Sequence, residues 1–247
     1  MSINFVLPFI STAVMLAFTM FVLQRYAARR APHFLFWGLG LAMFGAGSLA
    51  EAYLALAWNK WVFFVWYFFG AVLNAGWIGH GTVYLLFRKK WVHGLTVILI
   101  LGSLIALALM LQVMPRLDAS PCADGCIISE HYRSIMPSVQ DGATVRLTTP
   151  FFNIYGLLTL VGGALWSAFL FWRKRVLPNR VVGNVLIAAG ALSIGFASTL
   201  TRLGYGSLLY LGELVAAILM FAGFLTAAAP QPDEEPAPSA AAAPASN

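Results

Sequence analysis

WYFFGAVLNAGWIGHGTVY, from Trp66 to Tyr84, decides the fold because it is long enough to cross a bilayer and still carries polar groups. Asn74 and His80 stand in it among four glycines. At helical spacing, one stripe holds Gly70, Asn74, Trp77, Gly81 and Tyr84. Polar groups at membrane depth must face protein or water, since lipid tails offer no hydrogen-bond partner. The stretch therefore predicts a central helix of a membrane bundle.

The composition is that of an integral membrane protein. Of the 247 residues, 60% are hydrophobic and only 10% are charged, whereas a soluble globular domain has about 25% charged residues. The net charge of +6 comes from basic residues clustered beside apolar stretches, where they set orientation in the membrane. Because no basic patch interleaved with exposed aromatic residues is evident, nucleic acid is not expected as a partner.

Seven apolar stretches are each near or above the roughly 20 residues that a membrane-spanning helix needs. They lie at about 4–24, 34–58, 61–87, 92–114, 150–172, 181–203 and 206–229. We therefore expect an all-α bundle of seven transmembrane helices over residues 1–229. The tail at 230–247 is rich in Pro and Ala, which predicts a disordered cytoplasmic end. The first stretch lacks a basic segment before it, which favours a retained span over a signal peptide.

Three basic clusters predict the orientation. They are Arg25, Arg29 and Arg30; Arg88, Lys89 and Lys90; and Arg173, Lys174, Arg175 and Arg180. They follow the first, third and fifth stretches, so seven spans place all of them on one side. The positive-inside rule makes that side the cytoplasm. We expect a multi-pass protein of the bacterial cytoplasmic (inner) membrane, with its N-terminus outside and its C-terminus inside.

The long loop at about 115–149 is then extracytoplasmic, and it contains the only two cysteines, Cys122 and Cys126. Their close spacing and the oxidising side of the membrane favour a disulfide. A redox-active or metal-binding pair is the alternative. Glu130 and His131 are near in sequence, but a second pair of zinc ligands is not evident, so we predict no metal.

The two halves of the chain share a faint pattern. Gly38, Gly45 and Ser48 in the second stretch match the spacing of Gly183, Gly190 and Ser193 in the sixth. Such a pattern suits a three-plus-one-plus-three internal repeat with parallel halves. Small residues also recur at this spacing wherever helices pack closely. Both interpretations stay open at this point.

Four ionisable residues lie inside the expected spans: Glu51, His80, Arg202 and Glu213. Each costs about 2.5 to 3.5 kcal/mol at the centre of a span unless it finds a partner or water. In the assigned orientation Glu51, Arg202 and Glu213 fall in the outer half, whereas His80 is nearer the cytoplasm. The outer three form either an ion pair that pins three helices together or a polar pocket open to the outside.

The pocket interpretation assigns ligand binding to Glu51, Tyr53, Tyr67, Asn74, Arg202 and Glu213. A second polar site would consist of Trp77, His80 and Tyr84. Its structural alternative is a hydrogen bond from His80 to a neighbouring helix.

Missing residues argue against several chemistries. The seventh stretch has no lysine, which excludes a retinal Schiff base. Haem bound by two histidines is not expected, because His33, His93 and His131 do not lie at the depth of His80. GxSxG, HExxH and Walker motifs are absent. The aromatic run at 61–69 exceeds what interfacial anchoring needs, so a bound lipid or quinone-like molecule stays open as a cofactor.

Three segments carry a resemblance to known proteins. They are TPFFNIYGLLTLVGGALWSAFLFWRKR (149–175), LPNRVVGNVLIAAGALS (177–193) and LLYLGELVAAILMFAGFL (208–225). Over these last three spans the chain resembles uncharacterised bacterial seven-span membrane proteins, which implies a fold and no specific activity. The layout also loosely resembles the seven-span sensor regions of bacterial histidine kinases, although a short tail follows here in place of a kinase.

Together these features predict a non-enzymatic membrane protein. We expect it to bind a lipid-like or other small ligand in an outward-facing polar pocket, or to serve as an accessory subunit of a larger membrane complex or homo-oligomer. A small-solute transporter built from two three-helix repeats is the alternative. A lipid-modifying enzyme that uses Glu51, Glu213 and His80 as acid–base groups comes third.

Overall fold

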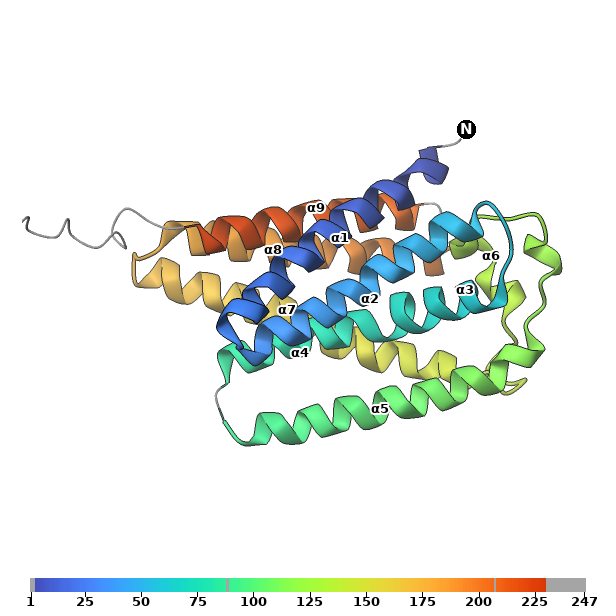
Figure 1. Ribbon diagram of the computed structural model, residues 1–247, viewed down its shortest axis with the longest axis horizontal. Helices are drawn as coiled ribbons and strands as arrows, with labels where there is room; N and C mark the ends of the chain where they lie inside the picture. The colour runs from blue at the N-terminus through green and yellow to red at the C-terminus, as the bar shows by residue number, and fades with distance from the viewer. Residues whose placement is uncertain (1–2, 88, 207, 230–247) are drawn as a thin grey trace, which may run out of the picture.

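The computed structural model is an all-α bundle in the part of the chain that it describes, residues 3–87, 89–206 and 208–229 (Figure 1). The side chains of residues 3, 4 and 202 lie outside that part, and so does the expected tail at 230–247. Seven described helical segments are long and apolar enough to cross a membrane. They confirm the seven spans expected from the sequence.

The spans are formed by α1 (Ile3–Arg29), α2 (Pro32–Leu54), the continuous series α3 (Lys60–Val65), η1 (Trp66–Leu73) and α4 (Asn74–Leu86), then α5 (Trp91–Val113), α7 (Val145–Arg173), α8 (Pro178–Arg202) and α9 (Leu208–Ala228). The long loop contains the short helices η2 (Met114–Arg116), η3 (Ser120–Cys122) and α6 (Ile128–Ile135).

Several span ends differ from the expected ones, and the second and fifth spans are examples. The second span ends at Leu54 rather than at 58, and Asn59 begins α3 by accepting hydrogen bonds at Oδ1 from the N–H groups of Trp61 (2.8 Å) and Val62 (3.3 Å). The fifth span begins at Val145 and includes Pro150 within the helix. A proline near the start of a helix removes few internal hydrogen bonds, so it does not mark the boundary here.

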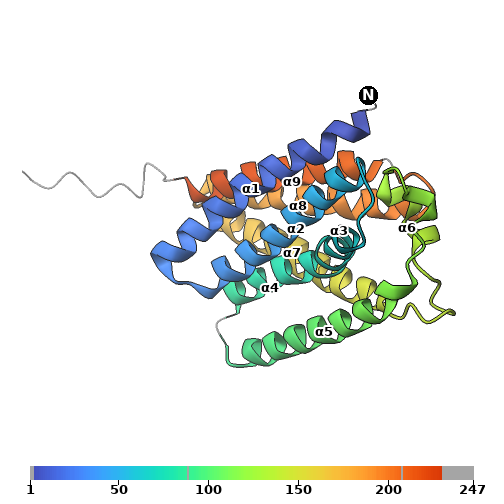
Figure 2. The same cartoon turned by 45° about the vertical axis from the view of Figure 1, so that its right-hand side comes forward.

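Six helices form a closed ring. Each contacts the next in the order α1, α2, α4, α7, α8, α9, and α9 returns to α1. The fourth span, α5, lies outside this ring, against α4, α7 and η1 (Figures 1 and 2). The ring therefore contains spans one to three and five to seven in chain order.

The glycines of the expected repeat make different contacts in the two halves. Gly45 of α2 faces Met15 of α1, whereas Gly190 of α8 faces Met220 of α9. In a parallel duplication span five matches span one, so Gly190 would face α7. Close helix packing accounts for both glycines, and the internal repeat stays a prediction.

Glycine pairs let the ring helices touch backbone to backbone. A methyl group on Gly47 of α2 would come within 2.7 Å of the Cα atom of Gly70 in η1. A methyl group on Gly79 of α4 would come within 2.8 Å of the Cα atom of Gly156 in α7. Such approaches are typical of helices that associate without a hydrophobic driving force.

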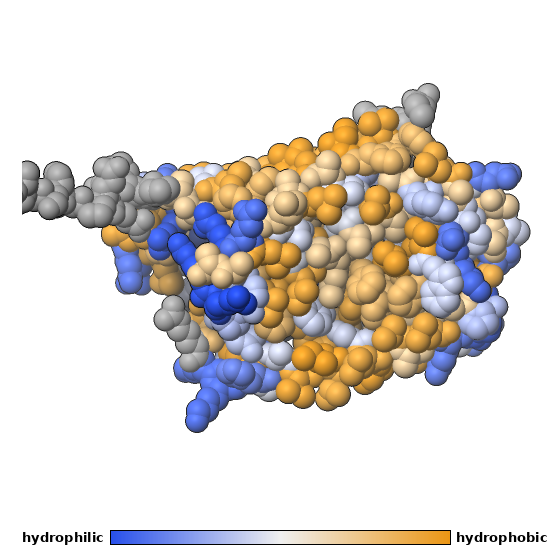
Figure 3. All heavy atoms as spheres, viewed as in Figure 1, coloured by the Kyte–Doolittle hydropathy of each residue, from blue (hydrophilic) through white to orange (hydrophobic). Residues whose placement is uncertain are grey.

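An apolar band separates two polar ends on the surface (Figure 3). We call one the basic end, where α1, α4 and α7 finish with Arg29, Lys89, Lys90, Arg173, Lys174 and Arg175. We call the other the loop end, where η2, η3 and α6 lie (Figure 1). The three basic clusters therefore share one end, as the alternation of seven spans requires.

The predicted disulfide joins Cys122 and Cys126, whose Cα atoms are 5.1 Å apart. The N–H of Cys126 donates a 2.9 Å hydrogen bond to the carbonyl oxygen of Leu54 at the end of α2. Gly125 has a φ of +90° and lies so close to Ala55 that an added Cβ would be 2.8 Å from its carbonyl oxygen. The disulfide loop is therefore docked on the end of the helix that carries Glu51.

Candidate functional site

A cavity of about 600 Å³ lies inside the ring on the loop-end side. We call it the loop-end cavity. Its walls come from α2, η1, α4, α7, α8 and α9, and residues of α6 also contribute. Its acidic and amide side chains are Glu51, Asn74, Asn153 and Glu213. A volume of this size is within the range of small-molecule sites, about 300 to 1,000 Å³.

Glu51 is the most deeply buried acidic group in the cavity wall, with 1% of its surface exposed. Its Oε1 accepts a 2.7 Å hydrogen bond from Nε1 of Trp66. Its Oε2 has no N–H or hydroxyl donor among the described residues, and the neighbouring carboxyl group of Glu213 is close enough to share a hydrogen bond with Glu51 when one of the two is protonated. A buried polar atom without a partner costs about 1 to 3 kcal/mol, so this oxygen is an unfilled acceptor at the cavity.

Glu213 of α9 lies beside Glu51 of α2, close enough for the two carboxyl groups to interact electrostatically. Ser48, one helical turn before Glu51, donates from Oγ to Oε2 of Glu213 at 3.5 Å. No basic side chain in the described part of the chain is among the groups acting on either carboxyl. The pair therefore presents acceptor oxygens to the cavity.

The segment η1 is a π-helix, which sequence reasoning missed. Its hydrogen bonds run from residue i to i+5, which makes the helix wider than an α-helix, and such segments are frequent at functional sites. Its cavity-lining residues are Trp66, Tyr67, Gly70 and Ala71. The one signal in the sequence is Gly70, which lets the widened turn lie directly on Gly47 of α2.

Four of the six expected ligand-binding residues line the cavity: Glu51, Tyr67, Asn74 and Glu213. Tyr53 does not line it and is 43% exposed, because a residue two positions after Glu51 points to the opposite side of a helix. The Arg202 side chain lies outside the described residues. Its ion pair with the two acidic groups stays a prediction.

Two arginines of the long loop also line the cavity, and sequence reasoning did not assign them to it. Arg133 lies in the last turn of α6, and its Nε donates a 3.2 Å hydrogen bond to the hydroxyl of Tyr132. Arg146 lies in the first turn of α7 and donates from Nη1 to the carbonyl oxygen of Pro137 at 3.0 Å. The cavity thus combines acidic groups in the bundle with basic groups at the loop end.

The expected second polar site is a set of helix–helix hydrogen bonds. His80 is fully buried, with Nδ1 2.7 Å from the hydroxyl of Tyr155 in α7 and Nε2 2.9 Å from Oγ1 of Thr96 in α5. The hydroxyl of Tyr84 lies 2.9 Å from the same Thr96 oxygen. Trp77 donates from Nε1 to Oγ of Ser103 in α5 at 3.2 Å. The bonds to Thr96 and Ser103 attach α5 to the ring, and the bond between His80 and Tyr155 joins α4 to α7.

The stripe expected from Gly70 to Tyr84 is divided between two surfaces. Gly70 and Asn74 line the loop-end cavity, whereas Trp77 and Tyr84 bond to α5. Asn74 and Trp77 both belong to α4, so the division falls within a regular α-helix, after the π-helical segment has ended. The α-helical spacing assumed for the stripe therefore applies from Asn74 onward, and its residues differ in the neighbouring helix that they contact.

The one described group of His, Cys, Asp and Glu residues that could hold a metal ion is Cys122, Cys126 and His131, with ligand atoms within 4.8 Å of one another. Both sulfur atoms are joined in the disulfide. Metal ligation by cysteine needs thiolates, so this form of the loop favours a structural role.

No known protein family, curated protein or solved structure matches the chain. The resemblances to seven-span proteins therefore stay predictions, and function has to be argued from the cavity.

Proposed function

We propose that the protein is a non-enzymatic membrane protein that binds, in the loop-end cavity, a small ligand carrying both an ammonium group and an anionic group. The observation that carries the proposal is the unpartnered Oε2 of Glu51, on a side chain that is 1% exposed at the wall of a 600 Å³ cavity. An ammonium group supplies the donor that this oxygen lacks.

An ammonium group suits two neighbouring carboxyl groups better than a neutral donor does. It has three N–H donors, so it can bond to Glu51 and to Glu213 at once. Hydrogen bonds between ionised groups are roughly twice as strong as neutral ones. A single cation between two acidic side chains also offsets the repulsion between them.

The arginines of the loop end suit the other half of the ligand. Arg133 and Arg146 both line the cavity, and guanidinium groups bind phosphate and carboxylate oxygens in a planar, two-donor geometry. The ammonium group of the ligand would lie near Glu51, and its anionic group would lie near the arginines, so that each charge faces an opposite charge of the cavity. This matching favours a zwitterion over a simple cation or a simple anion.

The proposed site faces the outside of the cell. The basic end carries the clusters that the positive-inside rule assigns to the cytoplasm, which leaves the loop end on the other side. The disulfide between Cys122 and Cys126 supports this orientation, because disulfides persist in oxidising compartments.

Phosphoethanolamine represents the required chemistry, either free or as the headgroup of a phospholipid. Ile154 lines the cavity and is also 57% exposed on α7. The cavity wall therefore extends to the apolar surface of the bundle, where a lipid could enter. Free phosphoethanolamine would enter from the loop end.

The test is native mass spectrometry of the protein extracted from membranes, followed by titration with three probes. These are short-chain phosphatidylethanolamine, free phosphoethanolamine and short-chain phosphatidylglycerol. We expect one or both of the ethanolamine compounds to bind at least about tenfold more tightly than phosphatidylglycerol, a difference of about 1.4 kcal/mol. The two ethanolamine titrations distinguish a lipid from a soluble ligand.

Glu51→Gln keeps the shape of the side chain and removes its charge, so it should weaken ethanolamine binding about tenfold. Asp124→Asn is the matched control, because Asp124 is an exposed acidic residue of the disulfide loop that does not line the cavity. Equal binding of all three probes, or unchanged binding by Glu51→Gln, would contradict the proposal. The same spectra would reveal a partner subunit if the protein belongs to a larger complex.

A further inference from the structure

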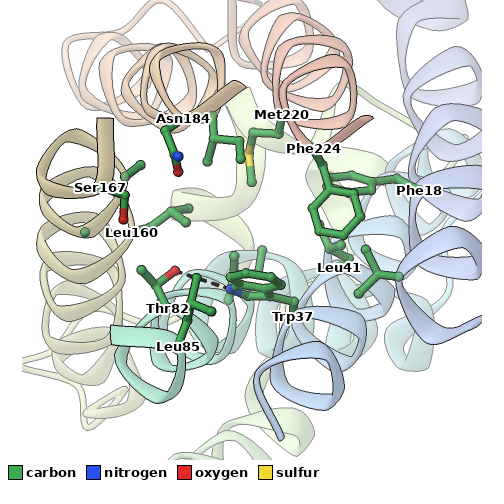
Figure 4. A pocket seen from close by; sticks show the side chains of 15 residues that line it. Phe18, Trp37, Leu41, Thr82, Leu85, Leu160, Ser167, Asn184, Met220 and Phe224 are labelled. Atoms are coloured by element: carbon green, nitrogen blue, oxygen red, sulfur yellow. Dashed lines mark hydrogen bonds between the residues drawn. The ribbon is translucent and has the colours of Figure 1, made fainter. Parts of the chain in front are cut away.

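A second, smaller cavity lies inside the ring toward the basic end (Figure 4). Its volume is about 50 Å³, and we call it the basic-end cavity. Figure 4 shows Trp37, Leu160, Met220 and Phe224 around it, with the dashed bond from Nε1 of Trp37 to Oγ1 of Thr82 (3.3 Å). Side chains of α1, α2, α4, α7, α8 and α9 contribute to its wall. These are the same six helices that form the ring.

The two cavities share three lining residues. They are Ile78 of α4, Leu160 of α7 and Met220 of α9, with 5%, 8% and 5% of their surface exposed. We call these three side chains the constriction. They come from three different helices of the ring, and Leu160 and Met220 lie near the middle of their spans. The two cavities are therefore separated by these apolar side chains, with no helix running between them.

We infer that the two cavities are the two ends of one passage and that the protein transports its ligand through the constriction. This inference rests on the proposed binding of a zwitterion in the loop-end cavity. The loop-end cavity has a volume of about 600 Å³ and the basic-end cavity one of about 50 Å³, so the space large enough for a ligand lies on the loop-end side of the constriction. Transport by alternating access requires such an arrangement, with the site near the middle of the membrane.

Polar side chains continue beyond the constriction. Thr82, Ser167 and Asn184 line the basic-end cavity and come from α4, α7 and α8. Asn184 holds its amide in place by donating from Nδ2 to the carbonyl oxygen of Arg180 at 2.7 Å. The rest of the basic-end cavity wall is apolar, so these three side chains are its polar groups.

Two side chains of the constriction, Ile78 and Met220, each pack against a glycine of a neighbouring helix. An added Cβ on Gly40 of α2 would be 2.7 Å from the backbone nitrogen of Ile78, and one on Gly190 of α8 would be 2.7 Å from Cγ of Met220. A glycine has no side chain of its own to hold the neighbouring helix in place, so small sliding movements at these contacts meet less steric resistance. Sliding at these two contacts would move Ile78 and Met220 apart.

The experiment measures uptake of radiolabelled free phosphoethanolamine into liposomes that contain the protein, together with binding of the same probe. We expect uptake above that of protein-free liposomes. Leu160→Trp should lower the maximal uptake rate, measured at saturating phosphoethanolamine so that a change in affinity does not affect it, about tenfold or more by filling the constriction. Leu158→Trp is the matched control, because Leu158 lies on the same helix, is 67% exposed and lines neither cavity.

Two results would overturn the inference and leave the proposed function standing. One is a wild-type protein that binds phosphoethanolamine without uptake, and the other is a Leu160→Trp protein with wild-type uptake. Absence of phosphoethanolamine binding by the wild-type protein would overturn the inference together with the soluble-ligand form of the proposed function.

A second variant keeps the test informative if Leu160→Trp fails to fold. Both native cysteines are in the disulfide, so Ser167→Cys gives a single reactive thiol in the basic-end cavity. We expect phosphoethanolamine to increase its reaction with a membrane-impermeant thiol reagent added on the basic-end side. A reaction rate that does not respond to the ligand would count against a passage.

Discussion

Nε1 of Trp66 lies 2.7 Å from Oε1 of Glu51 and donates a hydrogen bond to it, which joins the π-helical segment η1 to α2 inside the bundle. Both side chains are buried, with 6% and 1% of their surface exposed. The bond fixes Oε1 of the carboxyl group. The other oxygen, Oε2, receives no hydrogen bond from an N–H or hydroxyl group of the described residues. The indole thus positions the acidic group on which the proposed site depends.

Removing this donor should weaken both the fold and the site. We expect Trp66→Phe to lower the free energy of unfolding by about 1 to 3 kcal/mol, because Oε1 of Glu51 loses its partner. Ligand affinity should fall as well, since the carboxyl group is free to turn. Denaturant unfolding in detergent and native mass spectrometry measure the two effects. Trp172→Phe is the control, because Trp172 is 67% exposed, and equal losses in both variants would contradict the assigned role.

Two glycines of α7 should respond oppositely to the same substitution. A methyl group on Gly156 would meet the backbone and side chain of Ala75, whereas Gly162 has nothing within 4 Å of the added carbon. Gly156→Ala should destabilise the protein by about 1 to 3 kcal/mol through overpacking. Gly162→Ala should be neutral or stabilising by up to about 1 kcal/mol, because alanine favours helix. Thermal unfolding of both variants in the same detergent measures these changes in stability, and an equal change in the two variants would contradict the prediction.

The hydrogen bonds of Thr96 should control how firmly α5 is attached to the ring. Its Oγ1 lies 2.9 Å from Nε2 of His80 and 2.9 Å from the hydroxyl of Tyr84. Thr96→Val keeps the shape of the side chain and removes both bonds, so the amides of α5 should exchange hydrogen faster.

Ligand binding should be unchanged in Thr96→Val, since neither Thr96 nor His80 lines a described cavity. Hydrogen exchange followed by mass spectrometry reports α5 separately from the ring. Wild-type exchange in α5, or a loss of binding, would show that these residues have another role.

Acid should break the hydrogen bond between Asp118 and the backbone of Ser120 at the loop end. The N–H of Ser120 donates to Oδ1 of Asp118 at 2.9 Å, and this bond holds the pKa of the carboxyl below its ordinary value of 3.8. A lowered folded-state pKa means that the bond contributes fully above about pH 5 and is lost as the pH falls through the folded-state value.

Hydrogen exchange at the Ser120 amide, corrected for the intrinsic effect of pH, measures this change. Protection should be constant above about pH 5 and should decrease below about pH 4. Asp118→Asn should remove the pH dependence in this range. A decrease that persists in Asp118→Asn would assign it to another group.

Some parts of the site could be predicted from the sequence and others could not. Glu51, Asn74 and Glu213 were found because ionisable and amide groups inside apolar stretches are costly and therefore informative. Arg133 and Arg146 were missed because loop residues carry no depth signal, and the fold of the long loop decides which of them reach the cavity. Tyr53 was assigned by proximity in sequence, although the turn of the helix directs it away from Glu51.

The sequence by itself determined the seven spans, the gathering of the basic clusters at one end and the disulfide. These follow from local quantities, namely the length of apolar stretches, the charges that flank them and the spacing of two cysteines. The tertiary structure alone decided that Glu51 meets Glu213, that η1 is π-helical and that Ile78, Leu160 and Met220 separate two cavities. Each of these depends on which helix faces are brought together when the ring closes, and contacts between residues far apart in the chain leave no periodic signal in one sequence.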